Sequence, residues 1–152
     1  MNYRAPLLLI AGLTLSACSN GADSFSYAGL DYFNSSASFS GLPLTSAAMM
    51  PTTNATYQGR YSVEDGNGFD GSGDASLALN FTTSSANLTL TGDVVGTIPG
   101  SITGTSVSSN SFGLTSFDGD FYGTNGEVVG GTFKQVSGSS TDTLDGAYIV
   151  SR

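Results

Sequence analysis

The sequence has no tryptophan, no histidine and a single cysteine, and the shortage of histidine and cysteine limits the chemistry that the chain can carry out. Without histidine, neither a Ser-His or Cys-His nucleophile nor a zinc site built on imidazole is available, and haem cannot be held by histidine. Cys18 has no second cysteine to pair with, so no intramolecular disulfide staples the fold. We therefore expect neither an enzyme nor a bound cofactor.

Basic residues are also scarce. Four Lys and Arg stand against twelve Asp and Glu, which gives a formal net charge of −8. A chain this acidic repels the phosphates of DNA and RNA, so nucleic acid is excluded as a partner.

The first 17 residues have the organisation of a bacterial signal peptide. Arg4 supplies a positive charge and is followed by an apolar run from Ala5 to Leu15. That run is too short to span a bilayer as a helix, which fits a signal peptide better than a membrane anchor.

The end of this segment, Leu15-Ser16-Ala17-Cys18, resembles a lipobox. In such sequences the cysteine is lipidated, and several acyl chains together hold a protein stably on a membrane. We expect Cys18 to be the lipidation site. The residue after the cysteine is Ser19 and not Asp. In lipoprotein sorting, a residue other than Asp at this position implies the outer membrane.

Residues 18–53 are rich in Ser, Ala and Gly, and their aromatic residues follow no regular spacing. The composition predicts a flexible tether. In the alternative interpretation, Tyr32, Phe33 or Phe39 docks on the following domain as a partial strand. Met50-Pro51 marks the boundary, and we expect the folded domain to cover residues 54–152.

From Ala55 onwards, apolar and polar residues alternate as they do in half-buried antiparallel strands. Turn-forming residues such as Ser84-Ser85-Ala86 separate the periodic segments. The predicted strands are Ala55–Glu64, Leu77–Phe81, Leu88–Thr91, Ile98–Val107, Phe112–Thr115, Phe117–Gly123, Glu127–Val136 and Asp142–Val150.

About eight short strands in roughly 100 residues predict an all-β fold, a small up-and-down antiparallel barrel with an interior filled by side chains. Glycines alternate with aromatic residues on the predicted inward face, as in Gly59 with Tyr61 and Gly131 with Phe133, which suits a strongly curved sheet. A β-sandwich is the alternative fold. A transmembrane barrel is disfavoured because the outward positions are polar.

The stretch Phe117–Phe133 predicts a β-hairpin around Thr124-Asn125-Gly126, since an Asn-Gly pair accepts the positive φ angles of tight turns. Its run F-Y-G-x-N-x-E-x-x-G-G-T-F resembles the signature hairpin of the β-barrel domains of transferrin-binding protein B and related bacterial surface lipoproteins. The similarity extends over about Pro51–Arg152. It implies an eight-stranded barrel on a lipid anchor, often displayed outside the cell to capture a host protein or iron source.

Two groups of acidic residues are candidates for a metal site or a catalytic pair. The loop from Asp65 to Asp74 interleaves oxygen ligands with glycine, but Phe69 stands where an EF-hand places a ligand, so we favour a solvated turn over a calcium site. Asp118 and Asp120 have the spacing of a glycosidase pair, yet acids two apart on the wet face of a strand are ordinary. We expect no metal site and no catalytic residue.

In an up-and-down barrel, the tether and the C-terminus lie at one rim, and the opposite rim carries the longer loops. The acids that we assign to that opposite rim include a proposed partner-binding set: Asp65, Asp70, Asp74, Asp118 and Asp120. This rim would bind a basic protein or a small-molecule ligand. The leading hypothesis is a non-enzymatic surface lipoprotein that binds through its barrel, and the alternative is an envelope structural or assembly lipoprotein without a soluble ligand.

Overall fold

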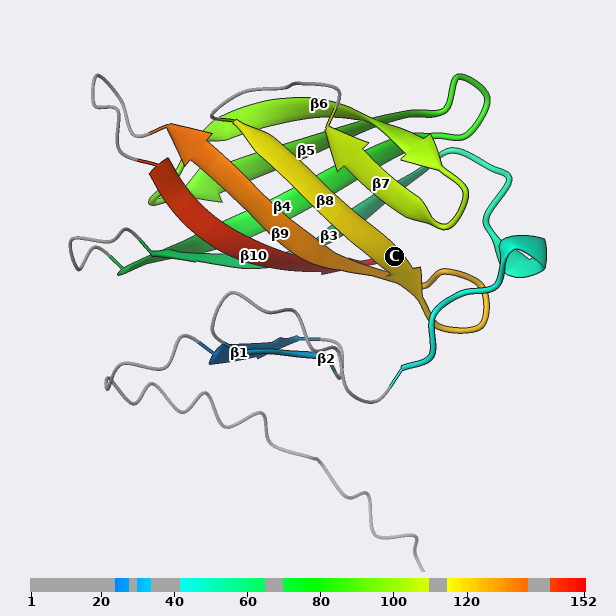
Figure 1. The fold of residues 1–152 in the computed structure, drawn as a ribbon, viewed down its shortest axis with the longest axis horizontal. Coiled ribbons are helices and arrows are strands. Elements are labelled where there is room, and N and C mark those ends of the chain that lie inside the picture. The colour runs from blue at the N-terminus through cyan, green and yellow to red at the C-terminus, as the bar shows by residue number, and fades with distance from the viewer. Residues whose placement is uncertain (1–23, 28–29, 34–41, 65–69, 110–114, 137–142) are drawn as a thin grey trace, which may run out of the picture.

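The computed structural model describes residues 24–27, 30–33, 42–64, 70–109, 115–136 and 143–152 of the chain (Figure 1). Ten strands and one short 3-10 helix lie within these ranges. They are β1 (Ser24–Tyr27), β2 (Leu30–Phe33), η1 (Ala47–Met49), β3 (Ala55–Glu64), β4 (Asp70–Asn80), β5 (Ser85–Gly92), β6 (Gly96–Thr103), β7 (Ser106–Ser109), β8 (Ser116–Tyr122), β9 (Val128–Val136) and β10 (Thr143–Ser151).

Eight of the strands, β3 to β10, form a closed antiparallel barrel in which each strand pairs with its neighbour in sequence. The first and last of them close it, with Tyr61 of β3 directly opposite Tyr148 of β10. The predicted up-and-down barrel is therefore confirmed, and the sandwich alternative is wrong. Closure leaves every barrel strand with two neighbours, which removes the exposed sheet edges of an open sheet.

Two strand boundaries differ from the prediction. Ile98–Val107 is not one strand, because Gly104 adopts a φ of +60° in a tight turn that separates β6 from β7. Strand β4 begins at Asp70 rather than at Leu77, since glycines at its start hide the apolar alternation. Phe112–Thr115 is not confirmed as a strand, because residues 112–114 lie outside the described residues and β8 begins after Thr115.

The barrel interior is filled by aromatic rings. Tyr61 packs edge-on against Phe133 with ring centroids 5.7 Å apart, and Phe117 packs against Tyr148 at 6.3 Å. Glycines make the room, because a Cβ atom on Gly73 would collide with the Tyr61 ring. The predicted packing of inward rings over glycines is thus confirmed, although each ring lies over a glycine of another strand rather than its own.

Two tyrosine hydroxyls tie the interior to the two ends of the barrel. We call the end with residues 55, 81–84, 104–105, 123–127 and 152 the near rim, and the end with residues 93–95 the far rim. Tyr57 donates a hydrogen bond to the carbonyl of Gly126 at the near rim (2.6 Å), and Tyr61 donates one to the carbonyl of Val94 at the far rim (3.0 Å). Ala55 and Arg152 share the near rim, as predicted.

The near-rim loop 123–127 places its positive φ angles differently from the prediction. They occur at Gly123 (+90°) and Gly126 (+65°), whereas Asn125 is not among the residues with positive φ. The Glu127 carboxylate accepts hydrogen bonds from the Asn125 backbone N–H (3.0 Å) and from its side-chain amide (3.2 Å). The backbone hydrogen bond is the main reason that the pKa of Glu127 is lowered.

Residues 42–54, which we call the strap, pack on the barrel and do not form a free tether. Strand β7 begins at Ser106, opposite Asp120, so the end of β8 extends past it with backbone groups in need of partners. The strap supplies them: Thr45 donates its N–H to the Phe121 carbonyl (2.9 Å), and the Pro43 carbonyl accepts from Gly123 (2.9 Å). The Thr45 hydroxyl also donates to the Gly123 carbonyl at 2.7 Å. The tether prediction is wrong for these residues.

The outer wall carries a small apolar patch at the start of the strap. It consists of Tyr122, Val128 and Ile149, with Leu42 of the strap packed against it. Strands β1 and β2 pair with each other as a separate sheet, and β1 lies beside β3 (Figure 1). Tyr32 and Phe33 are therefore in a strand but not in the barrel, and Phe39 lies outside the described residues. Among the described residues, no helix is long and apolar enough to cross a membrane.

Candidate functional site

The acidic residues that the sequence assigns to one rim are spread over the barrel. Cys18 and Asp65 lie outside the described residues. Asp70 opens β4 at the far rim, opposite Glu64. Asp74 lies further along β4 on the outer wall, where its carboxylate forms an ion pair with Arg60 at 3.2 Å.

Asp118 and Asp120 are held by hydroxyl groups of neighbouring strands. Thr132 donates to Asp118 and Ser106 donates to Asp120, each at 2.5 Å. Asp120 lies near the near rim, because β8 runs from the far rim to the near rim and the next residue, Phe121, bonds to Thr105 in a near-rim turn. The placement of Asp120 at the far rim is therefore wrong, and the four of these acids that the structure describes do not form one cluster.

At the described part of the far rim, two polar side chains form hydrogen bonds that hold residues 93–95, the link between β5 and β6, in place. The Asp93 carboxylate accepts from the Ser72 N–H (2.9 Å), and Gln135 donates to the Val95 carbonyl across the end of the barrel (3.2 Å). The Val95 side chain is 70% exposed. Over the ranges of the chain that the structure covers, no three Asp, Glu, Cys or His side chains gather closely enough to hold a metal ion.

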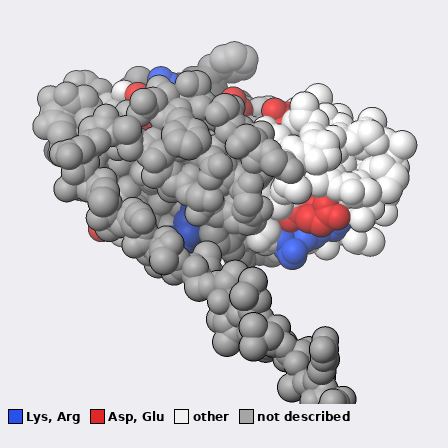
Figure 2. All heavy atoms as spheres, turned by 90° about the horizontal axis from the view of Figure 1, so that it is seen from below, with Lys and Arg blue, Asp and Glu red and all other residues white. Residues whose placement is uncertain are grey.

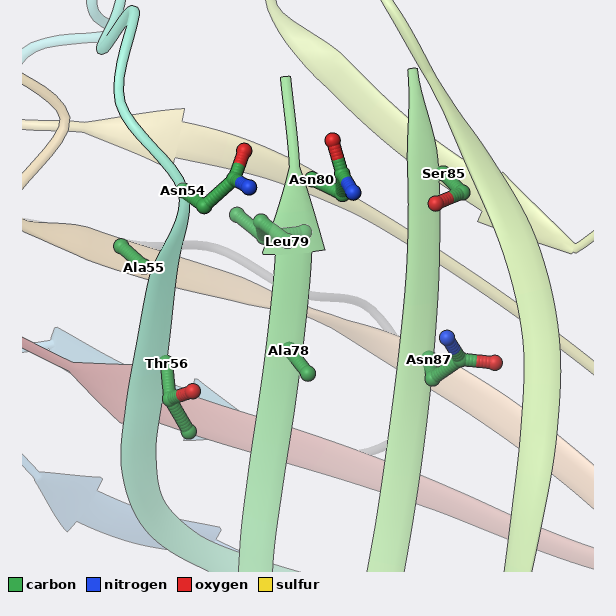
Figure 3. A pocket seen from close by; sticks show the side chains of 8 residues that line it. All are labelled: Asn54, Ala55, Thr56, Ala78, Leu79, Asn80, Ser85 and Asn87. Atoms are coloured by element: carbon green, nitrogen blue, oxygen red, sulfur yellow. The ribbon is translucent and has the colours of Figure 1, made fainter. Parts of the chain in front are cut away.

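A hollow of about 360 Å³ lies on the outer wall beside the near rim, across the start of β3, the end of β4 and the start of β5 (Figure 3). We call it the amide hollow. Its floor contains the exposed methyl group of Ala78, whereas the side chain of Ala55 packs against the barrel core. Its polar lining consists of three amides and two hydroxyls, and no charged side chain takes part: Asn54, Thr56, Asn80, Ser85 and Asn87.

The strand register brings this lining together in two rows. Asn80 lies directly opposite Ser85 across β4 and β5, and Ala78 lies opposite both Thr56 and Asn87. Neighbouring strands are about 4.8 Å apart, so the side chains of a row lie within reach of one small ligand. Figure 3 shows the Asn54 and Asn80 amides above the row that Thr56 and Asn87 flank.

Two of the amides have a fixed orientation. The Asn54 side-chain oxygen accepts from the Phe81 N–H (3.0 Å), and the Asn80 oxygen accepts from the N–H groups of Thr82 (3.0 Å) and Thr83 (3.1 Å). A backbone N–H needs an acceptor, so the oxygen and not the nitrogen must face it. The NH₂ groups of both side chains therefore point away from these backbone N–H groups and can donate hydrogen bonds to another molecule. Asn87 is exposed and makes no side-chain hydrogen bond within the described residues.

A second hollow of about 470 Å³ continues along the same strands toward the far rim. Its wall contains the Arg60–Asp74 ion pair together with Thr89 and Thr91. The Thr89 hydroxyl is hydrogen-bonded to that of Thr97 on β6 (3.1 Å). Sequence reasoning missed both hollows, because outward Asn, Ser and Thr residues on strands look the same as any solvated face.

No family model and no curated protein sequence matches the chain. Solved structures do. A mutant of transferrin-binding protein B from Actinobacillus pleuropneumoniae matches with a TM-score of 0.58 at 14% identity, over 90% of this chain and 83% of that one. The isotype 1 transferrin-binding protein B of serogroup B Neisseria meningitidis matches with a TM-score of 0.55 at 20% identity, over 86% of this chain and 36% of that one.

A mutant of the protein from Haemophilus parasuis matches with a TM-score of 0.55 at 15% identity, over 71% of this chain. The match covers only 28% of that longer chain. At these identities the likeness shows the fold. The chain has the β-barrel fold of transferrin-binding protein B, as the Phe117–Phe133 hairpin predicted.

Proposed function

We propose that this chain, which shares its barrel fold with transferrin-binding protein B, is a non-enzymatic binding protein that a lipid on Cys18 anchors to the bacterial outer membrane at the cell surface. The observation that carries the binding mode is the filled interior. Tyr57, Tyr61 and Tyr148 are at most 1% exposed and occupy the space where a small-ligand barrel would hold its ligand. A partner must therefore be bound by the outer wall or by the loops.

The position of the strap supports attachment from the near-rim side. Residues 43–45 bond to the end of β8, so the chain reaches the barrel at the rim that also holds the C-terminus. An anchor at Cys18 leaves the far rim and the outer wall available to a partner. The names of the similar structures, which are transferrin-binding proteins, support a macromolecular partner but do not specify it.

The alternative is an envelope protein with a structural or assembly role and no soluble ligand. Neither hypothesis involves catalysis, so an activity assay cannot distinguish them. The partner must therefore be recovered directly. Full-length protein, solubilised in detergent and immobilised, should be incubated with envelope extract from the producing cells and, separately, with growth medium and host fluids. Saturable recovery of a component from the second source supports the proposal. Recovery of envelope components alone favours the structural role.

A further inference from the structure

We infer that the amide hollow binds an uncharged oligosaccharide, which gives the proposed binding function a ligand class. The hollow offers amide donors and hydroxyls around the outward methyl group of Ala78, and these groups can meet the hydroxyls and a C–H face of a sugar. This inference rests on the proposed function and concerns one site on the outer wall.

Charge excludes ionic ligands from this part of the barrel. Strands β5, β6 and β7 contain no charged residue, although the chain carries a net charge of −8. The nearest basic group in the second hollow, Arg60, is already paired with Asp74. In Figure 2 the right-hand end of the molecule is mostly white, with one group of adjoining blue and red side chains within it and a few red atoms at its upper edge. A sialylated or sulfated glycan would find no cationic side chain in the lining of the hollow.

Geometry excludes the usual ways of holding a peptide. Closure of the barrel leaves no free edge along β3, β4 and β5 to which an extended segment could add as a strand. The hollow also lacks an apolar pocket for an anchoring side chain, because its apolar lining is limited to two alanines and the buried Leu79. Polar groups dominate what remains, and they suit a ligand made of hydroxyl groups.

The orientation of the donors gives the site its specificity. Since Asn54 and Asn80 use their oxygens on backbone N–H groups, their NH₂ groups are held in place before a ligand arrives. A preorganised donor loses less conformational entropy on binding than a free side chain does. Asn87 adds an amide that is free to serve as donor and acceptor on the opposite side of the floor.

The test is a binding measurement with detergent-solubilised full-length protein on an array of neutral, sialylated and sulfated oligosaccharides, followed by titration of the strongest ligand. One set of neutral glycans should be released from host glycoproteins and another prepared from the producing cell's own envelope. Binding to neutral members of either set supports the inference, and the set that binds identifies the source.

Two variants locate the site. Asn80→Asp keeps the oxygen acceptor for Thr82 and Thr83 but removes the NH₂ donor, and Asn87→Ala removes an exposed amide. Combined, they should weaken neutral-glycan binding roughly tenfold, since each lost hydrogen bond reduces affinity several-fold. Lys134→Gln on β9, across the barrel, is the control and should leave affinity unchanged. The thermal unfolding midpoint of each variant shows whether it is folded.

Equal affinity of the folded double variant and the wild type overturns the inference, as does a preference for sulfated or sialylated glycans. Absence of neutral-glycan binding alongside recovery of a protein partner in the pull-down also overturns it, while leaving the proposed binding function intact. Failure of the pull-down with every source would instead count against the proposed function itself.

Discussion

The hydroxyl group of Tyr61 makes two hydrogen bonds to one residue, donating to the Val94 carbonyl at 3.0 Å and accepting from the Val94 N–H at 2.7 Å. Tyr61 is inside the barrel and Val94 is in the far-rim link, so this pair fastens the link from within. Burial raises the pKa of Tyr61, and the hydroxyl therefore keeps its proton at neutral pH.

Replacing Tyr61 with Phe should lower the free energy of unfolding by about 2–3 kcal/mol, because both backbone groups of Val94 lose their partner away from water. Tyr57→Phe, which loses one hydrogen bond to Gly126, is the matched comparison and should cost about 1 kcal/mol. Urea unfolding followed by circular dichroism measures both. Equal losses in the two variants would contradict the double role of the Tyr61 hydroxyl.

Stability should fall at alkaline pH through Tyr122. Burial raises the pKa of Tyr122 to about 12, and the nearby Asp120 adds to the shift. Tyrosine in the unfolded chain loses its proton near pH 10, so between about pH 10 and 12 the unfolded state binds fewer protons than the native state. The Tyr122 contribution is therefore fully present below pH 10 and declines by up to about 1.4 kcal/mol per pH unit above it.

The measurement for this prediction is the free energy of unfolding across pH 8 to 12 for the wild type and Tyr122→Phe. The variant should lose stability less steeply above pH 10. The pKa of other buried tyrosines, Tyr148 above all, is also raised. The free energy of unfolding therefore still falls with rising pH in both proteins. Superimposable slopes would show that Tyr122 is not the group responsible.

The strap should loosen when Thr45 loses its hydroxyl. Thr45 is 4% exposed and donates to the Gly123 carbonyl, so Thr45→Val leaves that carbonyl without its side-chain partner. We expect a loss of about 1–2 kcal/mol and faster hydrogen exchange at the Gly123 amide. Thr53→Val, at an exposed position of the same segment, is the control. Unchanged exchange at Gly123 would mean that the backbone bonds alone hold the strap.

Membrane attachment should depend on Cys18. Cys18→Ala should move the protein from the membrane fraction to the soluble fraction, because the variant cannot carry the lipid that we propose as the anchor. Cell fractionation with a high-salt wash measures this. Ser19→Ala is the control for a change beside the cysteine and should stay membrane-bound. A Cys18→Ala protein that still sediments after the wash would contradict lipid anchoring.

The acidic residues can be divided by position to test a basic partner. Asp65→Asn with Asp70→Asn changes the segment that the sequence assigns to the far rim, whereas Asp118→Asn with Asp120→Asn changes the β8 wall. If a basic partner recovered from envelope or host binds the rim, the first pair should weaken binding and its salt dependence, and the second should not. If both double variants bind the partner with unchanged affinity that does not depend on salt, the acidic residues contribute only to solubility.

Alternation of apolar and polar residues was enough to predict the barrel and most of its inward face. In β3 every second side chain packs inside, as the sequence predicts, because the period of a strand is two. The strap was not predictable in this way. It is held by backbone groups of β8 that become available because β7 begins only at Ser106, opposite Asp120, and the sequence pattern does not show where β7 begins relative to β8.

The amide hollow was hidden for a related reason. Asn54, Asn80 and Asn87 are far enough apart in sequence that only the register of β3, β4 and β5 brings them together. The position of Asp120 was misjudged because its distance from each rim depends on where β8 begins and ends. Periodicity assigns a residue to a face of a strand with more certainty than to a height on the barrel.

Closure by β3 and β10 has a consequence for biogenesis. The pairing of Tyr61 with Tyr148 joins the first strand of the barrel to the last, so the final contact of the fold has a very large sequence separation. Such contacts form late and slowly, because the entropy of a long loop is lost before they are made. A ribosome or translocation channel that still holds β10 therefore prevents completion of the barrel. On the export route that we propose, the chain crosses the inner membrane as an unclosed polypeptide and acquires its last hydrogen-bonded ladder only after its C-terminus is released.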